Sequence, residues 1–176
     1  MIAFFRRRPI WMTSAMVFSV LGTAAHFAQA QGSFTDEKVW TEAAVAPPAT
    51  FNTELLLPFD VRKSSTLTYG IDPNTLTVGE DGVVRYVMVA RSSSGALNVL
   101  YQGIRCATAE TKTYGRLSDK GNWNASPDTA WQELSFRGST RPAMILARQG
   151  VCEGRAVTGN AQKILATLKS DRTQIR

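Results

Sequence analysis

Acidic side chains are the groups in this 176-residue chain that could do acid–base chemistry, because its single histidine, His26, lies in a segment that we expect to be removed. Nucleophilic catalysis by Ser-His-Asp or Cys-His sets needs an imidazole base, and catalytic zinc sites commonly use His ligands. A glycosidase, in contrast, needs only two carboxyl groups about 5–10 Å apart. The acids that could form such a pair are Asp60, Glu110, Asp119, Asp128 and Glu133.

Two polar patterns resemble ligand-binding loops but are better explained as turns. Asp72 with Asn74, and the pair Glu80-Asp81, offer calcium-type oxygens, yet the residues after Asn74 depart from the EF-hand spacing. Residues 91–95, RSSSG, contain phosphate-contacting types without the strand-to-helix glycine loop that such sites use. Turn chemistry accounts for both patterns. We therefore expect neither a metal ion nor a cofactor.

The N-terminal 30 residues are typical of a secretory signal peptide. Arg6-Arg7-Arg8 precedes an apolar stretch over residues 10–25, and Ala28-Gln29-Ala30 is a small-x-small cleavage pattern. We expect cleavage after Ala30 and a periplasmic location. The alternative is a membrane anchor formed by the uncleaved segment, although the apolar stretch is near the short limit for a spanning helix. Arg7-Arg8 also partly fits a twin-arginine signal, so both export routes stay open.

Signal cleavage would leave a mature chain that begins at Gln31 and carries a net charge of +3 instead of +6. We expect residues 31–53 to be a flexible leader and residues 54–176 to form a single globular domain. Cys106 and Cys152, an even pair without C-x-x-C spacing in an exported chain, predict a disulfide. No later apolar run approaches about 18 residues, so no transmembrane segment is expected after cleavage.

The centre of the chain predicts an antiparallel meander. Residues 83–90 and 97–104 are rich in β-branched and aromatic types, and Ser93-Ser94-Gly95 between them favours a hairpin. A two-residue Ser94-Gly95 loop would pair Met88 with Tyr101 and would place Tyr86 over Gly103. Residues 75–78 precede an Asp-Gly turn, which predicts a second hairpin.

The flanking segments complete the expected fold. Residues 55–61 and 67–71 predict strands, the first at an edge because it contains a proline, and residues 108–114 predict a polar, solvent-facing strand. Ser126-Pro127 is a helix-start signal that predicts a helix over 128–134, and apolar spacing predicts a C-terminal helix around 161–168. Residues 142–147 fit either a strand or a helical turn. The predicted fold class is α+β, mainly an antiparallel β-sheet meander with a short helix and a C-terminal helix; a β-sandwich is the alternative.

A string of motifs marks the same central region. It runs Y-G-I-D-P from Tyr69, V-G-x-D-G-V-V-R-Y from Val78, S-x-S-G-A-x-N-V from Ser92, and G-I-R-C from Gly103. This order resembles the family of cryptic-neisserial-protein-one-like (CNP-one-like) domains, which are uncharacterised envelope proteins of Gram-negative bacteria. The resemblance runs from about Trp40 to about residue 152. The family carries no established activity, so the resemblance transfers no site to this chain.

Charge is distributed unevenly along the predicted mature chain. Residues 137–176 have a net charge of +6, and residues 31–136 have a net charge of −3. The basic end predicts a contact surface for an anionic envelope component or an envelope protein, and the alternative is an ordinary solvated helix face. Nucleic-acid signature motifs are missing, so no nucleic acid is expected. The residues of this basic contact surface are Arg148, Arg155, Lys163, Lys169, Arg172 and Arg176.

These patterns favour an exported, non-enzymatic binding or interaction module. The alternative is a histidine-independent hydrolase, for example one that acts on glycans with a pair of the carboxylates above. A concave pocket with two facing acids would favour the hydrolase, and a flat basic or aromatic surface patch without such a cleft would favour the module.

Overall fold

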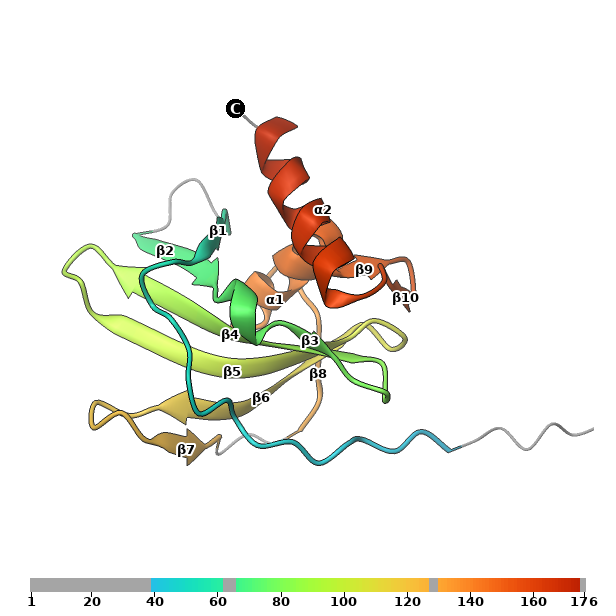
Figure 1. Ribbon diagram of the computed structural model, residues 1–176, viewed down its shortest axis with the longest axis horizontal. Helices are drawn as coiled ribbons and strands as arrows, with labels where there is room; N and C mark the ends of the chain where they lie inside the picture. The colour runs from blue at the N-terminus through green and yellow to red at the C-terminus, as the bar shows by residue number, and fades with distance from the viewer. Residues whose placement is uncertain (1–38, 62–65, 127–129, 175–176) are drawn as a thin grey trace, which may run out of the picture. The chain divides into compact units, whose positions relative to one another are not determined.

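The computed structural model describes residues 39–61, 66–126 and 130–174, with side chains as far as Ser170 (Figure 1). The part from Val39 onward forms one compact unit. The predicted signal peptide and its cleavage site lie outside the described residues. Among the helices within the described ranges, none has the length and apolar character needed to cross a membrane.

One antiparallel sheet carries the fold. Its main strand order is β1-β2-β4-β5-β6-β7, with β3 paired to β4 and β8 paired to β6, and β9 and β10 form a separate small hairpin. With a short helix and a C-terminal helix added, this is the α+β meander that the sequence predicted. The strands are β1 Leu57–Phe59, β2 Leu67–Ile71, β3 Thr77–Val78, β4 Val83–Ser92, β5 Leu97–Arg105, β6 Glu110–Leu117, β7 Trp123–Ala125, β8 Gln132–Glu133, β9 Cys152–Glu153 and β10 Ala156–Val157.

The β4–β5 hairpin exists as predicted, but its register differs by one residue. Met88 pairs with Leu100, so the predicted pairing with Tyr101 is wrong. The cause is the turn: Ser92 N–H donates to Ala96 O at 2.9 Å, which encloses a three-residue loop whose last residue, Gly95, has a φ of 87°. Three-residue hairpin loops place glycine at this left-handed position.

The corrected register also changes what covers the strand glycine. Gly103 lies opposite Arg85 in the ladder, not opposite Tyr86. A Cβ added at Gly103 would come within 2.9 Å of the Tyr114 ring and of Val83. The aromatic cover of this glycine therefore comes from β6.

The two faces of the sheet have separate cores. On one face, sheet residues such as Tyr86 and Ile104 pack with Leu146 and Ile164 from the helices. On the other face, Val87, Val89, Val99 and Tyr101 form a second cluster, against which Phe51, Leu56, Tyr114, Leu117 and Trp123 pack. The helices thus cover one face only, and the segment before β1 reaches the other.

The short helix lies later in the chain than predicted. The helix expected over 128–134 is wrong in its described part, because Gln132–Glu133 forms β8 against Glu110 and Thr111 of β6. Leu134 N–H also donates to Ala109 O at 2.8 Å. Backbone hydrogen bonds to the open edge of β6 outweigh the local helix-start signal at Ser126-Pro127.

The helical elements follow β8. Helix α1 spans Arg141–Leu146 and continues as a π-helical turn over Ala147–Val151, which resolves the ambiguous segment 142–147 as helix. The C-terminal helix α2 spans Ala161–Gln174 and buries Ile164 and Leu168, as its spacing predicted. Gly150 lets the turn approach α2 closely, since a Cβ there would lie 2.7 Å from Thr167 Cγ2.

Cys106, directly after β5, and Cys152, at the start of β9, have their sulfur atoms at disulfide distance, with Cα atoms 5.6 Å apart. This separation fits the usual disulfide range of about 4.4–6.8 Å. A bond here ties the end of the central hairpin to the C-terminal helical region.

Candidate ligand-binding cavity

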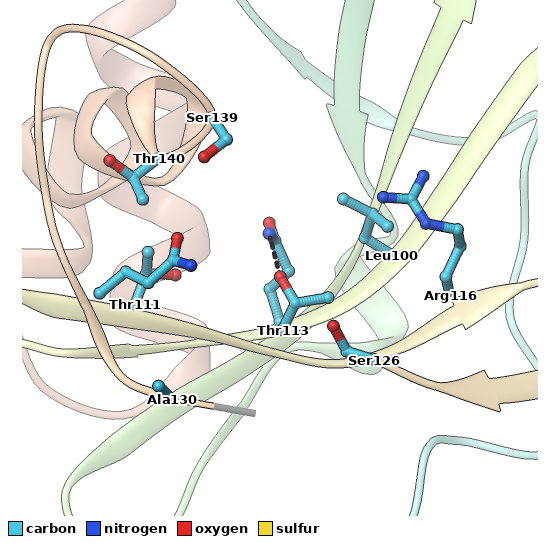
Figure 2. A pocket seen from close by; sticks show the side chains of 10 residues that line it. Leu100, Thr111, Thr113, Arg116, Ser126, Ala130, Ser139 and Thr140 are labelled. Atoms are coloured by element: carbon cyan, nitrogen blue, oxygen red, sulfur yellow. Dashed lines mark hydrogen bonds between the residues drawn. The ribbon is translucent and has the colours of Figure 1, made fainter. Parts of the chain in front are cut away.

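A cavity of about 240 Å³ lies on the helix-covered face of the sheet, between β5, β6 and the chain that leads from β8 into α1. In Figure 2, Ser139 and Thr140 lie on one side of the cavity, and Thr113 and Ser126 lie on another. Hydroxyls and carboxamides dominate the lining, with one leucine, one alanine and one arginine. The lining residues are Leu100, Gln102, Thr111, Thr113, Arg116, Ser126, Ala130, Gln132, Ser139 and Thr140.

A bulge in β6 shapes this wall. Gln102 pairs with Thr113, but the preceding residue, Tyr101, pairs with Gly115, so β6 contains one extra residue, Tyr114. The Tyr114 ring packs against Tyr101 on the opposite face of the sheet, with centroids 5.4 Å apart. A bulge of this kind shifts the alternation of side chains beyond it by one position.

That shift brings an arginine to the cavity. Thr111 and Thr113 face the cavity as alternate residues of β6, and strict alternation would give the next cavity position to Gly115. After the bulge, Arg116 stands opposite Leu100 instead, and both line the cavity.

Gln102, which lines the cavity, has a buried polar atom without a partner in the described structure. Its residue is only 7% exposed, and its Nε2 donates to Thr113 Oγ1 at 2.9 Å. Its Oε1 is buried without a hydrogen-bond partner in the described structure. Because the Thr113 hydroxyl can donate or accept, either orientation of the carboxamide leaves one end unpaired. A buried polar atom without a partner costs about 1–3 kcal/mol, which a ligand donor or a water could recover.

Arg116 supplies the charge of the cavity. It is exposed at the rim, where its Nη1 donates to Asn98 Oδ1 of β5. None of the described residues that line the cavity is acidic. A guanidinium that is held on one side keeps its remaining N–H donors available to a carboxylate or phosphate.

The opposite face of the sheet is crossed by residues 39–53, which we call the N-terminal strap (Figure 1). Pro48 O accepts from Trp123 Nε1 at 3.0 Å, and the Phe51 ring packs on Trp123 with centroids 5.3 Å apart. Asn52 N–H donates to the buried Asp72 carboxylate at 2.7 Å. The domain boundary at residue 54 stays a prediction, but these contacts pack the strap onto the sheet.

Asp81 fixes the first half of the strap. Its carboxylate pairs with Arg85 at 2.6 Å, with side chains 3% and 2% exposed, and accepts from Ala43 N–H at 2.9 Å. Burial alone would raise the Asp81 pKa, but hydrogen bonds from Arg85, Ala43 and Val83, with the charge of Arg85, lower the pKa to about 2. The backbone oxygen of Asp81 also accepts from Trp40 Nε1 at 2.8 Å.

Glu42 links the strap to β6 and to the segment before β8. Its Oε2 accepts from Lys112 Nζ at 2.9 Å and from Trp131 Nε1 at 3.2 Å. Burial would raise the Glu42 pKa, but these hydrogen bonds and the charge of Lys112 lower it. Trp131 also packs edge-on against Trp40, and the Arg105 guanidinium lies 3.6 Å from the centroid of the Trp40 ring. Since Ala130 and Gln132 line the cavity, the segment that carries Trp131 touches both the strap and the cavity.

The structure brings one pair of the predicted carboxylates together. Glu110 and Glu133 are direct partners in the β6–β8 ladder, and Glu110 also lies 3.9 Å from Arg105. Neither of these two acids lines the cavity. Asp60 follows β1 and Asp119 lies between β6 and β7, toward opposite edges of the sheet, and Asp128 lies outside the described residues. Within the described ranges, no three His, Cys, Asp or Glu side chains gather as a metal-ligand set.

The described residues of the predicted basic contact surface lie in the C-terminal region, between the π-helical turn and α2. Arg148 is exposed in the π-helical turn, Arg155 between β9 and β10, and Lys163 and Lys169 on α2. The Arg172 side chain and Arg176 lie outside the described structure. Arg148 also lines a second, shallow cavity of about 380 Å³ beside α2.

Sequence reasoning missed the residues that form the main cavity. Residues 108–114 were expected to form a solvent-facing strand, whereas Thr111 is buried and lines the cavity. The alternation of Thr111 and Thr113 could have indicated that both side chains share one face of a strand. The bulge that brings Arg116 to the cavity and the return of the chain at Ser139 depend on tertiary contacts, which the sequence does not show.

The sequence model of the CNP1-like family matches residues 35–169. This range covers the strap, the sheet, the cavity and most of α2. No curated protein and no solved structure shows a significant match to the chain.

Proposed function

This chain belongs to the CNP1-like family, and we propose that it is an exported, non-enzymatic binding module of the bacterial envelope that holds a small polar ligand in the main cavity. The signal-peptide pattern of residues 1–30 and the disulfide-distance cysteine pair support export. The cavity supports ligand binding.

The observation that carries the proposal is the buried Gln102 carboxamide. A structural glutamine inside a domain normally has both of its ends paired. Here one end is buried without a partner in the described structure, in a residue that lines a cavity of hydroxyls and amides. A few converging polar groups around a preformed hollow are the usual sign of a small-molecule site.

The hydrolase alternative has less support. The pair brought into register, Glu110 and Glu133, lies outside the cavity lining, and Glu133 is exposed. Glycoside hydrolysis needs both acids to flank the bound substrate. The cavity therefore supports binding better than it supports acid–base catalysis.

The test is a thermal-shift screen of the protein expressed from its full gene and recovered from the periplasm. The panel contains neutral monosaccharides, sugar acids, sugar phosphates and amino acids at millimolar concentrations. We expect at least one class to raise the melting temperature of the wild type, and to raise that of Gln102→Met less, because ligand bound only to the folded state stabilises it. If no compound distinguishes the two proteins, the cavity is not a ligand site.

The same preparation tests export. Cleavage after Ala30 gives an intact mass that begins at Gln31. A mass that includes residues 1–30 would instead favour the uncleaved anchor.

A further inference from the structure

We infer that the ligand of the main cavity is a sugar acid, that is, one hydroxylated ring bearing a carboxylate; this inference rests on the proposed function. Arg116 would bind the carboxylate at the rim, and Gln102 with the surrounding hydroxyls would bind the ring hydroxyls inside. Three features of the cavity lead to this class: its charge, its donors and acceptors, and its size.

The charge of the lining selects an anion. Arg116 is the charged residue among the described residues of the lining, and Asn98 holds its Nη1 from the side. Planar guanidinium groups recognise carboxylates through paired N–H donors.

The interior selects hydroxyl groups. Gln102 offers an unpaired amide end, and the hydroxyls of Thr113, Ser126 and Ser139 stand around the same space. Serine and threonine hydroxyls both donate and accept hydrogen bonds, as sugar hydroxyls do. An apolar ligand would leave the buried Gln102 atom unpaired, so the wall favours a polyhydroxylated molecule.

The volume fits one ring. The cavity of about 240 Å³ equals the volume of about eight waters, at roughly 30 Å³ each. This space accommodates one monosaccharide unit. A free sugar acid and the terminal sugar acid of a glycan share this chemistry. A methyl glycoside distinguishes them, because its anomeric oxygen is blocked as it is in a glycan. The cavity must accept the methyl glycoside if its ligand is the terminal residue of a glycan.

Calorimetric titration of the periplasmic protein with D-glucuronate, methyl glucuronide, D-glucose and glucose 6-phosphate tests the inference. We expect wild type to bind glucuronate at least about tenfold more tightly than glucose, since a charge-assisted pair contributes roughly that factor. Arg116→Gln should reduce glucuronate affinity to the glucose level. Lys120→Gln, which removes one positive charge from the exposed β6–β7 loop, is the control and should leave both affinities unchanged.

Two results would overturn the inference and can be told apart. If glucose binds as tightly as glucuronate, and Gln102→Met weakens both while Arg116→Gln weakens neither, the cavity is a site for neutral polyols and the proposed function survives. If glucose 6-phosphate binds more tightly than glucuronate, the anionic group of the ligand is a phosphate and not a carboxylate, and the proposed function also survives. If none of the four compounds binds to wild type, the sugar-acid class is wrong, and the wider thermal-shift panel alone decides the proposed function.

Discussion

At the residue scale, Asp81 shows how one turn residue can serve two parts of the molecule. Its carboxylate accepts from Val83 N–H within the β3–β4 turn, as turn chemistry leads one to expect of aspartate. The same carboxylate binds Arg85 and the strap backbone at Ala43. The sequence predicted the turn. The partner at residue 43 could not be predicted, because it lies 38 positions away in an irregular segment.

The low Asp81 pKa gives a pH-dependent prediction. A carboxyl group with a pKa of about 2 in the folded state and 3.8 otherwise stabilises the fold above about pH 4, by about 2 kcal/mol, and loses that contribution as the pH falls through about 2. In Asp81→Asn, the unfolding free energy should be lower at pH 7 and should fall less between pH 4 and pH 2. Urea unfolding at pH 7, 4 and 2.5 measures this difference.

Asp119→Asn is the control for that experiment, because Asp119 is exposed in the β6–β7 loop. Its variant should follow the wild-type pH profile. Equal pH profiles for Asp81→Asn and wild type would show that the ion pair with Arg85 does not anchor the strap.

At the element scale, the sequence predicted those helices and strands that are determined by residues close together in the chain. Alternating β-rich runs identified β2, β4, β5 and β6, and apolar spacing identified α2. The register of β4 and β5 was wrong by one residue because Ser94-Gly95 was read as a two-residue loop, whereas Gly95 closes a three-residue loop. The two loops place glycine differently, and the sequence letters fit both.

The elements that form the cavity depend on contacts between residues far apart in the chain. The bulge at Tyr114 follows from packing against Tyr101 and from the ladder with β5, and β8 forms because β6 offers an unpaired edge. A local helix-start signal at Ser126 pointed the other way. The family motifs themselves fall on strands, turns and strap contacts, such as Asp72, Asp81 and Arg85, and not on the cavity wall. The motif string could therefore predict the family without predicting the site.

At the scale of the whole molecule, the uneven charge yields a prediction about docking. If the basic contact surface meets anionic envelope lipid, the protein should co-sediment with anionic vesicles at low salt and release near physiological salt, as exposed charges are screened. Reversing Lys163, Lys169, Arg172 and Arg176 to Glu should abolish sedimentation. Reversing the same number of basic residues elsewhere, Lys120, Arg137, Arg91 and Arg116, is the control and should retain it. Sedimentation that ignores salt, or that survives the first set of reversals, would leave these charges as ordinary surface.

The whole molecule presents a strap on one face of the sheet and a polar cavity on the other, with the segment around Trp131 in contact with both. This arrangement leaves the cavity accessible beside the rim residue Arg116 while the strap covers the second core. The ligand site that we propose therefore lies on the helix-covered face, away from the strap.

The most direct test of that claim is the side-chain amide signal of Gln102 in a ¹H–¹⁵N spectrum, assigned by its absence from the Gln102→Met spectrum. We predict that D-glucuronate moves this signal progressively and to saturation, while the indole signals of Trp40 and Trp123, on the strap face, stay in place. A titration in which neither glucuronate nor glucose moves the Gln102 signal, or in which only the strap indoles respond, would contradict a ligand site in this cavity.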